Sequence, residues 1–255
     1  MISPLFHLTL EDFAAFNKKF HNPNNAVLVV AGDIDIELTK SLIKKYFDEI
    51  KEGKPIVRNF TKEKPITETI FSEAFDENIQ IPANILAYRT PSMKTRESRV
   101  FDMISTYLSS GQSSILYKKL VDEKKMALQV FAGNNSQEDY GIYLIGGLPL
   151  GDTKLPELTF EIDEEIEKLK SELISERDFQ KIQNIFESQY VSSNSTIQGI
   201  ANSLARYHVL YGDVNLINNE IDIYRSVTRE EIREVAKLYL NKNQRLELKY
   251  LPKNN

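Results

Sequence analysis

The segment TREEIREVAKLYLNKNQRLEL (228–248) repeats, without gaps, the segment TLEDFAAFNKKFHNPNNAVLV (9–29). Each segment is typical of a capped helix followed by a turn and a strand. Any two capped helices that precede a strand share some features, but the match also indicates a duplicated domain. The identical residues, which exceed the one or so expected from ordinary composition, are Thr9, Glu11, Lys18, Asn22 and Asn24, aligned with Thr228, Glu230, Lys237, Asn241 and Asn243.

The two copies differ in the length of chain before them. The second segment comes after enough residues for a whole domain, whereas the first comes after only eight residues. If the chain contains a duplication, we therefore expect it to be the back part of a longer protein, beginning near the end of the first repeat.

The hydrophobic periodicity predicts an α+β fold, in which helices pack on one face of an antiparallel sheet. Pro82 indicates an edge position or a bulge in its strand, because proline cannot donate to a β-ladder. Strands are expected at 26–32, as a pair within 66–90, at 126–133 and 140–149 as antiparallel neighbours, and near 244–251. Helices are expected at 9–20, from 33 or 35 to 50, and at 96–108, 113–124, 156–173, 176–192, 197–211, 214–226 and 228–240.

Composition excludes several classes of function. The net charge of -5, with 32 basic and 37 acidic residues, argues against a general nucleic-acid binder. The absence of cysteine excludes disulfides, thiol nucleophiles and thiolate metal sites. No apolar run is long enough to predict a membrane span. We expect a soluble protein, cytoplasmic or periplasmic, and the sequence does not choose between these compartments.

Four segments resemble one family, the insulinase- and pitrilysin-type zinc metallopeptidases, also called inverzincins. HLTLEDFAAFNKKFHNPNNAVLVVAGDID (7–35) is similar to the part that closes their catalytic domain. FDMISTYLSSGQSSILYKKLVDEKKMALQVFA (101–132) resembles their second, non-catalytic domain, and ERDFQKIQNIFE (176–187) and VTREEIREVAKLYL (227–240) resemble its closing helices. The resemblance covers nearly the whole chain and extends to bacterial zinc proteases and to mitochondrial processing peptidase.

The resemblance implies a peptidase whose homologous α+β domains enclose a chamber, with zinc held in the first domain by a His-x-x-Glu-His helix. This chain lacks that motif, and its histidines, His7, His21 and His208, are scattered. We therefore expect no cofactor in this chain and zinc in the parent protein. The implied partners are the missing N-terminal catalytic domain or subunit and a peptide substrate, with no nucleic acid.

In paired-subunit members of the family, the non-catalytic domain supplies an arginine and, seven residues later, a tyrosine that contact substrate. The aligned residues here are Val121 and Leu128, so the resemblance carries over no group that could polarise a peptide carbonyl. These two residues are our candidate substrate contacts, as part of an apolar wall. The alternative is that both simply pack in the core.

Three other patterns have two interpretations each. Gly111 to Ser114 is a helix cap or an anion site, and the cap is favoured because no phosphate-loop lysine surrounds it. His208 beside Arg206 is a packing residue or a proton-transfer group without a partner. The acidic run 161–167 is a solvated helix face or a calcium loop, and its helical periodicity favours the first.

These observations predict three parts: residues 1–50 end the preceding catalytic domain, 51–65 form a linker, and 66–251 form the insulinase-like second domain. The expected function is the non-catalytic C-terminal part of a zinc metalloendopeptidase, forming the chamber wall opposite the zinc-bearing domain. This part alone is expected to be inactive. The alternatives are a non-enzymatic scaffold or core subunit of a larger complex, and a self-standing peptide-binding module.

Overall fold

The computed structural model describes residues 8–57, 60–61 and 64–253. The chain divides into two compact units, one of residues 64–190 with 218–255 and the other of residues 1–63 with 191–217. Each unit is described by itself. The three-part division expected from the sequence stays a prediction.

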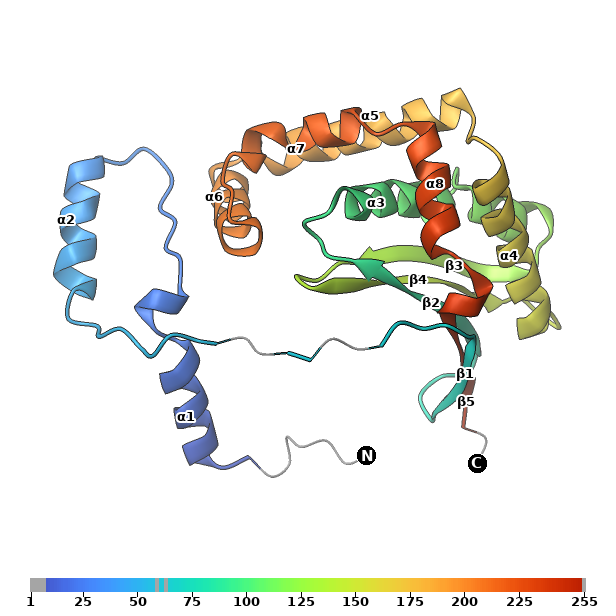
Figure 1. Ribbon diagram of the computed structural model, residues 1–255, viewed down its shortest axis with the longest axis horizontal. Helices are drawn as coiled ribbons and strands as arrows, with labels where there is room; N and C mark the ends of the chain where they lie inside the picture. The colour runs from blue at the N-terminus through green and yellow to red at the C-terminus, as the bar shows by residue number, and fades with distance from the viewer. Residues whose placement is uncertain (1–7, 58–59, 62–63, 254–255) are drawn as a thin grey trace. The chain divides into compact units, whose positions relative to one another are not determined.

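The larger unit is built on a five-stranded sheet with the order β1-β5-β2-β4-β3 (Figure 1). β3 and β4 are antiparallel neighbours, as predicted, and β1 and β5 form the one parallel pair of the described sheet. The expected pair within 66–90 exists as two strands, but β5 lies between them. The strands are β1 (Ile70–Asp76), β2 (Ala83–Pro91), β3 (Ala127–Asn135), β4 (Tyr140–Pro149) and β5 (Arg245–Pro252).

Pro82 does not mark an edge strand. It directly precedes β2, which is the central strand of the sheet and pairs with β5 and β4 on its two sides. A proline is compatible with this place because the ladder hydrogen bonds begin after it. The expectation of an edge position at Pro82 was therefore wrong.

Helices of the larger unit cover one face of the sheet, which confirms the predicted α+β class (Figure 1). Fully buried residues of β2 and β4, such as Leu86 and Ile145, meet Phe101 and Ile104 of α3 and Ile162 of α4 in one core. The helices are α3 (Arg96–Ser109), the π-helical η3 (Tyr117–Glu123), α4 (Leu155–Ser171), α5 (Glu176–Ser193), α7 (Leu216–Arg225), α8 (Arg229–Tyr239) and the short η5 (Lys242–Gln244).

α5 and α7 lie side by side (Figure 1). The rings of Phe186 on α5 and Tyr224 on α7 stack with centroids 4.4 Å apart. The side-chain amide of Gln183 donates to the carbonyl oxygen of Arg225 at 3.3 Å. An apolar stack and a polar contact together hold the two helices in register.

The smaller unit contains α1 (Leu10–Phe20), η2 (Pro23–Asn25), α2 (Ile36–Phe47), α6 (Ile197–Arg206) and the π-helical η4 (Tyr207–Tyr211). Helices α1 and α2 have no buried residue. Residues 26–32, predicted as a strand, form no β-strand in the described chain. These residues have the apolar composition of a strand, but no other strand of the described chain lies beside them. A β-strand needs such a neighbour, because it cannot satisfy its own backbone hydrogen bonds.

The repeat found in the sequence has matching local structures. α1 and α8 are both 11 residues long, and each begins with a capping box. The backbone N–H of Asp12 donates to Oγ1 of Thr9 at 3.3 Å, and that of Glu231 donates to Oγ1 of Thr228 at 3.1 Å. Each helix is followed by a three-residue 3-10 turn, η2 or η5. The two segments therefore share more than a general pattern.

Candidate functional site

The predicted substrate contacts lie where η3 passes into the edge strand β3. The turn between them is closed by two backbone hydrogen bonds, from Lys124 N–H to Lys119 oxygen at 2.9 Å and from Met126 N–H to Leu120 oxygen at 2.8 Å. Lys125 between them has φ of 49°, which is unusual for a residue other than glycine. The chain thus reverses within a few residues, and η3 is held close to the start of β3.

Val121 and Leu128 have different surroundings. Val121 is partly buried and packs against the core of the larger unit. Leu128 is 46% exposed on β3, at a shift of register where the strand departs from regular pairing with β4. Bulges at sheet edges commonly re-aim a side chain. Whether either residue contacts a substrate remains a prediction.

The acidic run of α4, expected to be a solvated face, is in part a buried one. Glu165 is buried and forms ion pairs with Lys119 of η3 and, at 2.8 Å, with Lys168. Hydrogen bonding to Glu165 raises the pKa of Lys168 above its ordinary value. Glu161 pairs with Lys124. The pairs with Lys119 and Lys124 therefore join α4 to η3 and to the residue that follows it, while the Glu165–Lys168 pair runs along α4 itself.

Asp163 of the same run lies in a second buried charge cluster. Arg245 of β5, 2% exposed, donates to both carboxylate oxygens of Asp163, with Nη2 to Oδ2 at 3.0 Å. Nη1 of Arg245 also donates to the Tyr88 hydroxyl at 2.9 Å, and burial raises the pKa of Tyr88 to about 12. This bidentate pair fastens α4 to the sheet.

Sequence reasoning missed these buried acids, although a signal was present. Asp163 and Glu165 lie within the stripe of α4 that also holds Leu158, Ile162 and Ile166. An acid within a buried stripe predicts a cationic partner, because an unpaired buried charge is costly. The identity of that partner could not be read, since Arg245 lies 82 residues away.

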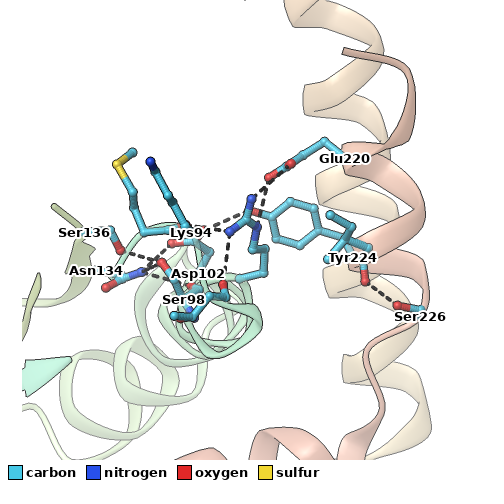
Figure 2. A network of polar contacts seen from close by, with 12 residues as sticks. Lys94, Ser98, Asp102, Asn134, Ser136, Glu220, Tyr224 and Ser226 are labelled. Carbon is cyan, nitrogen blue, oxygen red and sulfur yellow. Dashed lines mark hydrogen bonds and ion pairs between the residues drawn. The ribbon is translucent and has the colours of Figure 1, made fainter. Parts of the chain in front are cut away.

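A third polar network joins α3 to α7 and β3, as Figure 2 shows. The carboxylate of Asp102 accepts from the Asn134 amide at 2.9 Å and from the Tyr224 hydroxyl at 2.8 Å. Burial raises the pKa of Asp102 above its ordinary value, although both donors lower it. Burial likewise raises the pKa of Tyr224. Asp102, Asn134 and Tyr224 thus satisfy one another's hydrogen bonds, so the network has a structural role.

The same helix holds a buried arginine. Nε and Nη2 of Arg99 contact the two carboxylate oxygens of Glu220 at 3.2 and 3.3 Å, and Nη1 donates to the carbonyl oxygens of Met93 at 2.5 Å and Thr95 at 3.0 Å (Figure 2). Both charged residues are buried. The pair is oriented by fixed backbone acceptors, so the cluster stabilises the attachment of α7.

Two other sequence patterns are now located. Ser114 donates its hydroxyl to the carbonyl oxygen of Gly111 at 2.7 Å, and Lys181 donates to the carbonyl oxygen of Ser113 at 3.0 Å. The 111–114 segment is thus a closed turn, consistent with the favoured capping interpretation. His208 lies exposed in η4, whereas His7 lies outside the described residues.

The described residues do not fit a zinc site. No three histidine, cysteine, aspartate or glutamate side chains gather there in a metal-binding group. His21 is on the exposed end of α1, where its Nδ1 lies 2.8 Å from the Asn17 amide. The buried acids Asp163, Glu165 and Glu220 are engaged by arginine or lysine. We therefore assign no chemical step to a metal held by this chain.

Comparison with known proteins identifies the family. The family model described as "Peptidase M16 inactive domain" matches residues 7–186. This match spans more than half of the chain, so the chain belongs to the peptidase M16 inactive domain family, which confirms the resemblance found in the sequence. Within 8–57, 60–61 and 64–253, the structure has no helix with the length and hydropathy needed to cross a membrane.

Individual relatives agree with this assignment. The zinc protease PqqE of Helicobacter pylori is 28% identical over 205 residues, which cover 79% of this chain and 46% of that protein. A crystal structure of a protease from Helicobacter pylori matches with a TM-score of 0.89 at 24% identity, over 96% of this chain and 60% of that one. The peptidase M16 inactive domain from Pseudomonas fluorescens matches with a TM-score of 0.81 at 14% identity, over 97% and 59%. The chain spans about half the length of the curated relatives that it matches.

Proposed function

We propose that this chain is the non-catalytic part of a zinc metalloendopeptidase and forms the wall of a substrate chamber opposite the zinc-bearing domain. The observation that carries the proposal is the match of residues 7–186 to an inactive peptidase domain. Relatives named as zinc proteases in three bacteria support the same reaction class for the parent protein. The partner is an N-terminal domain of the same family, and the substrate is a peptide.

The pairing of the buried acids supports a structural part for this domain. A zinc peptidase needs free donors for the metal and a carboxylate to activate water. In the described chain Asp163 and Glu220 are each buried against an arginine, and Glu165 against lysines. A carboxylate held in such a pair is occupied by its cation, so these acids stiffen the fold.

Val121 and Leu128 give this wall an apolar character in the proposal. Leu128 is the better candidate for direct contact, because its side chain is exposed on an edge strand. Val121, partly buried beneath the surface of the core, would support the position of Leu128. Apolar groups of a peptide would be favoured there over charged ones.

The test of the reaction class is peptide hydrolysis by the full-length gene product. We expect cleavage of an internally quenched peptide that stops with a zinc chelator and returns with zinc, and no cleavage by the 255-residue chain alone. Chelator-sensitive cleavage by the 255-residue chain would contradict the assignment of a non-catalytic part. A full-length gene product that folds, binds no zinc and cleaves no peptide would favour the scaffold function.

The wall can be tested separately by Leu128→Asp in the full-length gene product. Loss of one apolar contact of about 1.4 kcal/mol corresponds to roughly a tenfold rise in KM for peptides with apolar side chains. Phe160→Asp, on the exposed side of α4, is the matched control and should leave KM unchanged. An unchanged KM in Leu128→Asp would remove this residue from the proposed substrate surface.

A further inference from the structure

The smaller unit contains a pocket between α1 and residues 51–57, the sequence KEGKPIV, which we call the strap. Its volume is about 1230 Å³, whereas pockets for small molecules usually measure about 300–1000 Å³. The described residues that line it all belong to the smaller unit. The pocket is therefore a feature of this unit by itself, and it has room for a ligand larger than an ordinary small molecule.

Specific contacts hold the strap against the turn that follows α1. The side-chain amide of Asn24 donates to the carbonyl oxygen of Gly53 at 2.9 Å, and its oxygen accepts from the Gly53 N–H at 3.0 Å. Asn22 donates to the carbonyl oxygens of Lys18 and Lys19 at 3.0 and 2.9 Å, which joins the same turn to the end of α1. A Cβ at residue 53 would collide with the Asn22 amide, so the strap lies this close because residue 53 is glycine.

Lysine side chains line the pocket on both sides, and acidic side chains do not balance them. The lysines are Lys18 and Lys19 of α1 and Lys51 and Lys54 of the strap, and the acid among the described lining residues is Glu52. The ion pair described in this unit, between Lys40 and Glu37, lies on α2. Within the described residues these four lysines therefore have no carboxylate partner, and the pocket is positively charged.

The same pocket has apolar walls between its lysines. Phe20 and Ile56 are partly buried there, and Val57 is 84% exposed. Nζ of Lys19 lies 5.0 Å from the centroid of the Phe20 ring, so cationic and apolar groups are neighbours. A ligand that satisfies both kinds of group carries negative charges and apolar side chains close together.

The second copy of the repeat lacks this unpaired charge. Lys237 of α8 is aligned with Lys18 of α1, and Nζ of Lys237 forms an ion pair with Glu234 at 2.9 Å. The residue of α1 aligned with Glu234 is Ala15, which lines the pocket. Alanine at this place leaves Lys18 without the helical partner that Lys237 has, so the positive charge belongs to the first copy.

We propose that this pocket binds an acidic, partly apolar segment of another polypeptide chain. Lysines on both sides of a pocket are satisfied by several negative charges spaced along a ligand, and a single carboxylate would leave most of them unpaired. A peptide in which acidic and apolar residues follow one another supplies charges with this spacing. The site is additional to the proposed chamber wall, since Val121 and Leu128 belong to the larger unit.

The first experiment is a fluorescence anisotropy titration with a labelled peptide in which glutamate and leucine alternate. We expect the 255-residue chain to bind it saturably, at one peptide per chain, and less tightly as the salt concentration rises. The same peptide with lysine in place of glutamate should not bind. Absence of saturable binding, or equal binding of the two peptides, would overturn the proposal.

Sodium dodecanoate tests the other ligand chemistry that apolar walls and lysines allow. We expect an equimolar amount of it to leave the glutamate–leucine peptide bound, because its single carboxylate satisfies only part of the pocket. Displacement of the peptide under these conditions would identify an amphiphile with one charge as the better ligand and would overturn the assignment to a peptide.

A matched pair of double variants tests whether the pocket lysines act as a site. Lys18→Gln with Lys54→Gln removes one charge from α1 and one from the strap, and should raise the Kd of the glutamate–leucine peptide about tenfold, because exposed ion pairs contribute modestly. Lys44→Gln with Lys45→Gln on α2 changes the net charge equally, outside the described lining of the pocket, and should change the Kd less than about twofold. Equal weakening in both variants would indicate general attraction of anions to the chain and would overturn the proposal.

Gly53→Ala tests the geometry of the pocket at constant charge. The added Cβ should displace the strap from Asn22 and raise the Kd at least as much as the loss of two lysines does. The Tm should change little, because residue 53 is not part of the described core. Binding of parental strength by the folded Gly53→Ala variant would show that the lysines attract the peptide without the pocket, and would contradict the proposal.

Discussion

The segments 9–31 and 228–250 have nearly the same local structure and very different surroundings. Both begin with a threonine capping box, continue for 11 helical residues and end in a 3-10 turn. Ile232 of α8 is completely buried, whereas the aligned Phe13 of α1 is 60% exposed. The comparison shows that the helix and its ends are local properties, while burial and strand formation depend on the rest of a domain.

The physical reason lies in the backbone hydrogen bonds. A helix satisfies most of its N–H and carbonyl groups internally, and its first turn is completed by a cap. A strand satisfies these groups only against a neighbour. α1 therefore forms as α8 does, whereas residues 26–31 need a sheet to become a counterpart of β5.

The largest expected effect concerns the charge pair found only in the second copy. Arg245 is aligned with Ala26, so the first copy has no equivalent of its contact with Asp163. Asp163→Ala leaves a buried guanidinium without its bidentate partner and should lower the free energy of unfolding by about 3–5 kcal/mol. Glu164→Ala, at the exposed neighbouring residue, should change it by less than about 0.5 kcal/mol. Urea denaturation measures the free energy of unfolding of both variants. Equal losses in the two variants would show that the Asp163–Arg245 pair does not stabilise the fold.

The next effect compares the two helices directly. Ile232→Ala should lower the free energy of unfolding of the 255-residue chain by about 2–5 kcal/mol, because it leaves a cavity in the core. Phe13→Ala in the same chain should change it by less than about 0.5 kcal/mol, because Phe13 is mostly exposed. A comparable loss in both variants would show that α1 packs in this chain as α8 does.

Replacing the capping threonine should lower global stability in the second copy and only local helix stability in the first. Replacement of a threonine N-cap by alanine costs about 1 kcal/mol of helix stability. Thr228→Ala should therefore reduce the global free energy of unfolding, because α8 is part of the core. Thr9→Ala should leave that value unchanged and increase hydrogen exchange within α1 only. A global loss from Thr9→Ala would contradict the independence of the first copy.

The smallest effect concerns the acidic residues of the two capping boxes. Hydrogen bonding from Arg96 is the main cause that lowers the pKa of Glu231, and bonds from Thr9 lower the pKa of Asp12. A carboxyl whose folded pKa is lowered stabilises the fold above its ordinary pKa and loses this contribution as the pH falls through the folded pKa.

Arg96→Ala should raise the pKa of Glu231 toward its ordinary value and leave that of Asp12 unchanged. Carbon-13 NMR titration of the two carboxyl groups measures both values. The acid-induced loss of α8 should then begin at a higher pH in the variant than in the parent chain. A shift in the pKa of Asp12 in the same variant would contradict the independence of the two capping boxes.

Much of the fold could be predicted from local patterns in the sequence. The strand predicted at 140–149 is β4 with the same bounds, and 126–133 is β3 within two residues at each end. These two strands could be predicted from local sequence because neighbouring strands of a hairpin need only each other.

Three predictions failed because they required knowledge of distant segments. The position of β2 in the centre of the sheet depends on β5, which joins from the far end of the chain and separates β2 from β1. The burial of Asp163 depends on Arg245, and no strand of the described residues pairs with 26–31. In each case the residue type was compatible with two surroundings, and local pattern could not choose between them.

The amino-acid sequence by itself determined the helix ends, the hairpin, the repeat and the family, because these depend on residues close together or on their order along the chain. Only the tertiary structure decided which strand is central, which acids are buried and which copy of the repeat is packed. The reason is that strand pairing and the neutralisation of buried charge both require partners from other parts of a domain, and no local pattern specifies them.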